Sequence, residues 1–108
     1  MYEYDILVSI RFLSKAQGVG RCNLPPIKDN EYFYRPIFRL ENDKSGYCCG
    51  IVIGNYIENY KFDADLMNIK LLFLQFSRIK NKLYVGEKFN LFEGNVLIGT
   101  GQIIKIKE

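Results

Sequence analysis

The sequence contains no histidine, and this absence excludes several kinds of active site. A chain without histidine has no serine–histidine–aspartate triad, no histidine-ligated zinc ion and no imidazole base that titrates near neutral pH. Its three cysteines, Cys22, Cys48 and Cys49, include no CxxC pair, so we expect no metal and no cofactor. Their odd number does not suggest a disulfide framework, and we expect free, partly buried thiols in a reducing compartment.

Long apolar runs are also missing. No run approaches the ~20 residues of a membrane-spanning helix, and the acidic start of the chain, residues 1–5, differs from the basic and then apolar start of a secretory signal. We therefore expect a cytoplasmic protein with no membrane partner.

The 108 residues fit one domain, residues 1–108, with a single hydrophobic core. Hydrophobic residues make up 48% of the chain, and Tyr, Phe, Ile and Val, which favour strands over helices, are abundant. The formal net charge of +3 is compatible with an acidic protein or RNA partner but requires neither.

Residues 88–107 form the clearest pattern, two extended runs around Gly94-Asn95, which predicts a tight β-hairpin. A two-residue turn would place Leu91 opposite Ile98 and Phe89 opposite Thr100. The buried face would then carry Phe89, Leu91, Ile98, Ile104 and Ile106. Gly99 and Gly101 would lie on the other face, where glycine lets a strand coil or lets another backbone come close.

The remaining strands are predicted from shorter patterns. Alternation in residues 4–12 predicts a strand that buries Ile6, Val8, Ile10 and Phe12. Two more strands are predicted, one at residues 31–40, which Pro36 interrupts, and one at residues 47–53. Residues 67–76 are apolar on both faces, which suggests a strand covered on both sides. Residues 13–30 and 54–66 read as loops, and no helix pattern exceeds two turns, so the chain predicts a small all-β barrel or sandwich.

Several short motifs, in order, resemble the C-terminal β-barrel of translation elongation factor Tu. They are Leu13-Ser14-Lys15, Gly20-Arg21, Tyr34-Arg35-Pro36-x-Phe38, Asn68-Ile69-Lys70, and Phe89-x-Leu91-x-Glu93-Gly94 followed by Ile98-Gly99-x-Gly101. The resemblance covers roughly residues 4–106. It implies one small closed antiparallel β-barrel of about six strands.

In that family the barrel is not catalytic: it contacts transfer RNA, packs on the nucleotide domain and receives the exchange factor. Here the nucleotide domain is missing. No Gly-x-x-x-x-Gly-Lys-Ser/Thr loop occurs, and Asn81-Lys82 lacks the aspartate that would read guanine, so we expect no nucleotide and no GTP hydrolysis. The family's two arginines around Glu-Gly are replaced by Phe92 and Val96, which weakens the argument for family-style RNA binding.

The resemblance leaves Lys15, Arg21, Tyr34 and Arg35 as candidate partner-binding residues. Arg21 and Arg35 could bind a phosphate or an acidic partner. The alternative is pairing within the chain, with Asp29, Glu31 or Glu41 as the acid. Tyr34 could stack on a partner, or lie with its hydroxyl at the barrel rim.

A second candidate set lies in residues 77–82. On an extended segment Arg78, Lys80 and Lys82 would share one side and form a basic stripe for nucleic acid; a solvated, lysine-protected edge is the alternative. Asp63 and Asp65 are expected to be exposed in a loop and not to act as an acid–base pair.

We therefore expect a non-catalytic binding module that acts through protein contacts, such as a mimic, decoy or immunity-type protein linked to the translation machinery. An RNA- or transfer-RNA-binding barrel is the alternative. An enzyme would need a cysteine nucleophile with no histidine to activate it, so we expect no enzymatic activity.

Overall fold

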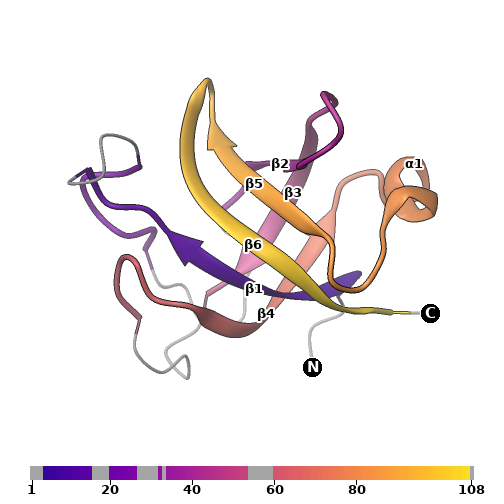
Figure 1. The fold of residues 1–108 in the computed structure, drawn as a ribbon, viewed down its shortest axis with the longest axis horizontal. Helices are drawn as coiled ribbons and strands as arrows, with labels where there is room; N and C mark the ends of the chain where they lie inside the picture. Colours follow the sequence, from indigo (N-terminus) through magenta and orange to yellow (C-terminus); the bar gives the residue numbers. More distant parts are fainter. Residues whose placement is uncertain (1–3, 16–19, 27–31, 33, 54–59, 108) are drawn as a thin grey trace.

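Six antiparallel strands close into a barrel in the computed structural model of the protein, which describes residues 4–15, 20–26, 32, 34–53 and 60–107 (Figure 1). The order around the barrel is β1-β4-β3-β2-β5-β6, and β6 pairs with β1 to close it. The strands are β1 (Ile6–Phe12), β2 (Ile37–Leu40), β3 (Tyr47–Val52), β4 (Leu66–Phe73), β5 (Lys88–Glu93) and β6 (Val96–Ile106). The predicted all-β class and closed barrel are confirmed.

Alternating side chains of the strands fill the barrel. In β1, Ile6, Val8, Ile10 and Phe12 are at most 1% exposed, as the alternation predicted. Aromatic rings occupy the centre: Phe38 stacks on Phe89 with the ring centroids 4.5 Å apart, and Phe73 meets Phe38 edge-on at 4.9 Å. The described residues include no buried polar or charged side chain, so the interior is a packed apolar core.

The β5–β6 hairpin forms, but its predicted register is wrong beyond the turn. Glu93 pairs with Val96, as a two-residue turn requires, whereas Leu91 pairs with Gly99 because Ile98 is an extra residue in a β-bulge. Beyond the bulge the inward positions of β6 shift by one. Ile103 is therefore buried in place of Ile104, which is the extra residue of a second bulge, opposite β1. Ile106 pairs with Ile6 and packs against the core as predicted, although it is only half-buried.

The same shift places Gly101 opposite Phe89, on the inner face and not on the outer face that we predicted. A Cβ atom at residue 101 would lie 2.3 Å from the carbonyl oxygen of Ser9 and 2.4 Å from Cζ of Phe89. Glycine is therefore required by the close approach of β1 and a buried ring, which is one of the two roles that we expected for it.

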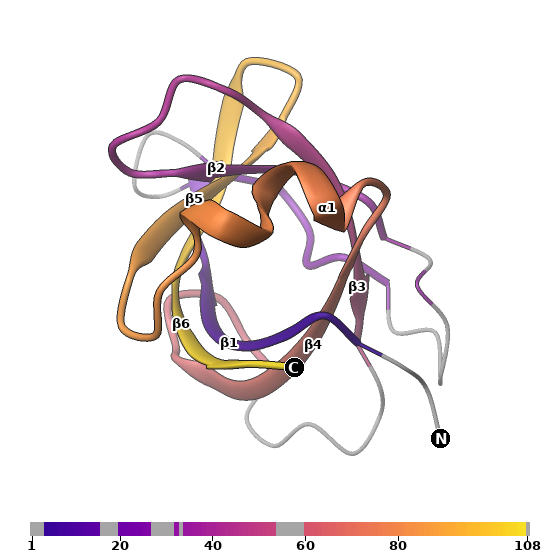
Figure 2. The same ribbon diagram turned by 90° about the vertical axis from the view of Figure 1, so that its right-hand side faces the viewer.

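β4 is shorter than predicted. It ends at Phe73, and Phe76 already begins the helix α1 (Phe76–Ile79), which the 3₁₀ turn η2 (Lys80–Lys82) continues. The strand is also not covered on both faces, since Leu72 is 36% exposed. α1 lies across one end of the barrel (Figure 2) and buries Ile79 in the core together with Leu83, which follows η2.

The second predicted strand is reduced to β2. Pro36 precedes the strand, which fits a residue that cannot donate to the ladder, and Tyr34 makes only an isolated bridge to Ile51. Residues 31 and 33 of that prediction, and parts of both predicted loops, lie outside the described residues.

Candidate functional site

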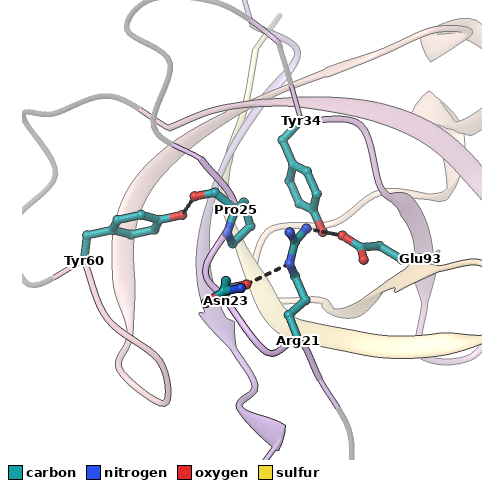
Figure 3. Close-up of polar contacts among 6 residues, drawn as sticks. All are labelled: Arg21, Asn23, Pro25, Tyr34, Tyr60 and Glu93. Atoms are coloured by element: carbon teal, nitrogen blue, oxygen red, sulfur yellow. Dashed lines mark hydrogen bonds and ion pairs between the residues drawn. The ribbon is translucent and has the colours of Figure 1, made fainter.

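Three polar side chains from separate parts of the chain meet at one rim of the barrel: Arg21, Tyr34 and Glu93, hereafter the rim cluster (Figure 3). Arg21 follows β1, Tyr34 precedes β2 and Glu93 is the last residue of β5. One carboxylate oxygen of Glu93, Oε2, accepts hydrogen bonds from both the Tyr34 hydroxyl and Nη1 of Arg21. The contact with Arg21 is also an ion pair, with side chains that are 24% and 39% exposed.

The backbone places Arg21 at this rim. Its N–H donates to the carbonyl oxygen of Leu13 at 3.1 Å, and the N–H of Gly20 donates to that of Leu97 at 2.8 Å. Gly20 has φ +86°, and a Cβ atom there would lie 1.9 Å from the Leu13 carbonyl oxygen. Only glycine fits, so the Gly20-Arg21 motif has a local structural cause.

Aromatic rings support the cluster from inside. The Tyr34 ring packs edge-on against Phe12 with centroids 6.3 Å apart, and Cζ of Arg21 lies 5.2 Å from the Tyr34 centroid. On the other side Phe12 meets Tyr60 edge-on at 6.5 Å, and the Tyr60 hydroxyl donates to the carbonyl oxygen of Pro25 (Figure 3). Tyr34 therefore occupies the rim position that was the alternative to partner stacking.

Electrostatics keep these groups in their ordinary protonation states at neutral pH. Burial raises the pKa of Tyr34, and its hydrogen bond to Glu93 raises that pKa further. Burial also raises the pKa of Tyr60, to about 12. Burial alone would lower the pKa of Arg21, but its contacts with Tyr34 and Glu93 outweigh this and raise it. The cation of Arg21 and the neutral phenols of Tyr34 and the neighbouring Tyr60 therefore do not titrate near neutral pH.

Arg21 pairs within the chain, which was the alternative to partner binding, but with an acid that we did not name. Asp29 and Glu31 lie outside the described residues, and the carboxylate in contact with Arg21 is that of Glu93, not that of Glu41. Glu93 belongs to the closing-hairpin motif, but no role was predicted for it. Its place in that motif, together with Arg21 and Tyr34, was the available signal.

The other matched residues lie around the cluster without joining it. Lys15 is exposed and lines, with Arg21, Cys22, Glu93 and Val96, a shallow pocket of about 290 Å³. Arg35 is exposed, and its Nε donates to the carbonyl oxygen of Tyr32 at 3.1 Å.

The second predicted set lies at the opposite end of the barrel, which α1 covers (Figures 1 and 2). The predicted extended stripe is wrong, because residues 76–82 form α1 and η2 and their alternate side chains do not share one side. Arg78 and Lys80 are exposed. Nζ of Lys82 instead donates to Asp43 at 3.2 Å and to the Tyr47 hydroxyl at 3.0 Å. Hydrogen bonds with Tyr47 and Asp43 raise the pKa of Lys82.

The remaining candidates do not form a reactive centre within the described part of the chain. Within the described residues, no group of three His, Cys, Asp or Glu side chains is placed to hold a metal ion. The thiols are free, with Cys22 exposed, Cys48 half-buried and Cys49 buried, where burial raises its pKa. Asp63 and Asp65 are exposed as predicted, and they accept hydrogen bonds from Ser14 and Arg11, respectively.

Two larger hollows occur on the outer surface. One, of about 530 Å³, lies over β1, β5 and β6 and has both acidic and basic lining residues, including Arg11, Glu41, Asp65 and Lys88. The other, of about 600 Å³, is lined by residues 45–48, Leu74, Gln75 and Arg78.

Comparisons with models of known protein families and with curated proteins gave no match. No helix in the described part of the chain has the length and apolar character needed to cross a membrane. The predicted cytoplasmic location stays a prediction.

Proposed function

We propose that this protein is a non-catalytic binding module that acts through protein contacts on the outer surface of its barrel. The observation that carries the proposal is the filled interior. The barrel is closed, its core is apolar, and none of the described polar or charged side chains is buried in it. Enzymes place perturbed ionisable groups in a cleft. The perturbed groups here are phenols, a thiol and surface pairs that are held by structural contacts.

The convergence of the motifs supports a barrel of the elongation factor Tu C-terminal type. Leu13, Gly20 and Arg21 are joined by backbone contacts, and Arg21 and Tyr34 both donate to Glu93. Each of these residues belongs to one of the quoted motifs, although they span 80 positions from Leu13 to Glu93. Motifs that together build one local structure indicate this type of barrel more specifically than any one of them does alone. In this proposal the protein acts as a mimic, decoy or immunity-type partner linked to the translation machinery.

Exposed apolar side chains beside α1 supply contact area for a protein partner. Leu74 is 74% exposed just before α1, and Tyr84 and Val85 are 67% and 65% exposed just after η2. Tyrosine is enriched at protein interfaces because it offers a large surface with few rotatable bonds. These residues favour a protein over a polyanion at this end of the barrel.

Size-exclusion chromatography of the labelled protein in nuclease-treated cell extract tests the proposal. We expect part of the label to elute at a higher mass than the purified protein alone, and to return to its own position when unlabelled protein is added in excess. Elution only at the position of the free protein would contradict the proposal.

RNA binding is the alternative, and the exposure of Arg78 and Lys80 is the observation that favours it. Against it, Arg21 and Lys82 are already paired, and Phe92 and Val96 replace the family's arginines. A titration with transfer RNA at several salt concentrations separates the two functions. If the protein binds RNA phosphates, its affinity for transfer RNA should fall steeply as the salt concentration rises. Our proposal instead expects no saturable binding of transfer RNA at physiological salt.

A further inference from the structure

The 600 Å³ hollow beside α1 has the features of a peptide-binding groove. Its walls come from the start of β3, the end of β4 and the beginning of α1. The N–H of Leu74 donates to the carbonyl oxygen of Cys48 at 3.1 Å, which fixes the two walls together. The volume lies within the range of sites that hold small ligands, and it can hold a few residues of a peptide.

The groove combines one apolar wall with one cation. Leu74 is 74% exposed, and Cys48 and Tyr47 are half-buried beside it. Tyr47 is held in place, because its hydroxyl accepts a hydrogen bond from Lys82. Arg78 is the only charged residue in the lining.

Within the described residues, no acidic side chain forms an ion pair with Arg78. Asp43, in the adjoining turn, already accepts hydrogen bonds from Lys82 and from the backbone N–H of Ser45. A guanidinium on the rim of an apolar groove is complementary to a carboxylate next to a large apolar side chain.

We propose that this groove binds an acidic segment of a protein partner that also carries large apolar side chains. The apolar side chains would pack against Leu74 and Cys48, and a carboxylate would contact Arg78. The inference rests on the proposed protein-binding function and names the chemistry of the partner. A polyanion such as RNA would use Arg78 but leave the exposed Leu74 wall unoccupied. A second copy of the chain is a less suitable occupant, because the net charge is +3.

The test uses the ¹⁵N-labelled full chain and three capped hexapeptides. One alternates leucine with glutamate, the second leucine with lysine, and the third serine with glutamate. At about 1 mM peptide, a concentration suited to weak contacts of one short segment, we expect saturable amide shifts at residues 45–48 and 74–78 with the leucine–glutamate peptide alone. Equal shifts with the serine–glutamate peptide or with an RNA oligonucleotide would overturn the inference. So would shifts that depend on protein concentration without peptide, or the absence of saturable shifts.

Variants separate a specific contact from general attraction. Arg78→Glu should weaken binding of the leucine–glutamate peptide at least about tenfold, because one charge-assisted hydrogen bond is lost. Lys105→Glu makes the same charge change at an exposed position of β6 and is the control. It should leave the affinity within about twofold of the parent value. Leu74→Ser should also weaken binding of this peptide. Equal losses with Arg78→Glu and Lys105→Glu would overturn the inference. A partner that co-elutes with the parent chain and equally with Arg78→Glu would refute the groove but leave the proposed function standing.

Discussion

Arg21 and Glu93 lie 72 residues apart in the sequence and form an ion pair that ties the segment after β1 to the end of β5. The same carboxylate oxygen accepts a hydrogen bond from the hydroxyl of Tyr34, which precedes β2. One acidic residue thus joins three parts of the rim, and three of the quoted motifs meet at this contact.

Removing the charge of Glu93 tests this role. Glu93→Gln should lower the free energy of unfolding by about 1–2 kcal/mol, since two hydrogen bonds to a charged group are weakened at a partly exposed site. Urea denaturation of parent and variant measures the difference. Glu41→Gln, the same change at an exposed residue, should stay within about 0.5 kcal/mol of the parent. Similar losses in both variants would contradict the role of the rim cluster.

The Gly20-Arg21 motif predicts a strong dependence on glycine. Gly20→Ala places a Cβ atom 1.9 Å from a backbone carbonyl oxygen at φ +86°, so we expect a loss of at least about 3 kcal/mol from strain and the forced shift. Gly94 also has positive φ, +60°, but a Cβ atom there meets nothing within 4 Å. Gly94→Ala should therefore cost only about 1–2 kcal/mol. Chemical denaturation ranks the two variants, and a Gly94→Ala loss as large as that of Gly20→Ala would contradict the packing of this segment.

Tyr60 should make the protein less stable in alkali. The pKa of tyrosine is 10.0 without perturbation, and burial raises that of folded Tyr60 to about 12. Between these values the unfolded chain loses the proton and the folded chain keeps it. The stability from the half-buried phenol is therefore complete below pH 10 and falls as the pH rises from 10 towards 12.

Unfolding free energies measured from about pH 8 to about pH 11 should fall less steeply in Tyr60→Phe than in the parent chain. The slope is the relevant quantity, because loss of the hydrogen bond to Pro25 also lowers stability at every pH. Tyr84→Phe, at a side chain that is 67% exposed, is the control and should keep the parent slope. Identical slopes in all three proteins would argue against the burial of Tyr60.

The three thiols should react in a fixed order. Iodoacetamide should label exposed Cys22 first and half-buried Cys48 more slowly, and it should reach Cys49 only when the protein unfolds, because Cys49 is buried and its pKa is raised. Mass spectrometry of timed digests measures the order. Labelling of Cys49 as fast as that of Cys22 in the folded protein would contradict the packing of β3.

Alternation of apolar residues was enough to predict an all-β fold, and the resemblance implied the closed barrel, but neither predicted the finer register. Ile6, Val8, Ile10 and Phe12 repeat with the period of a strand, so β1 and its buried face were readable. The bulge at Ile98 could not be predicted, because an extra residue leaves the sequence pattern of a β-hairpin intact and only shifts the pairing of the residues beyond it. α1 was missed because a helix of four residues, anchored by Phe76 and Ile79, is too short for a detectable helical period.

Two of the three members of the rim cluster could be selected from the sequence, but the contacts that join them could not. The motifs selected Arg21 and Tyr34, which the structure brings together. Their shared acid, Glu93, could not be inferred locally, because only closure of the barrel brings β5 beside the segment that follows β1. The interpretation of residues 78–82 as a stripe failed because it assumed an extended backbone.

Affinity capture with the tagged protein from nuclease-treated extract, followed by mass spectrometry and quantification of bound nucleic acid, tests the central claim most directly. The account predicts one or a few proteins recovered in a near-stoichiometric ratio to the bait, absent with a tag-only bait and released by excess untagged protein. Recovery of RNA without a protein from untreated extract, or of nothing beyond the tag-only control, would contradict it.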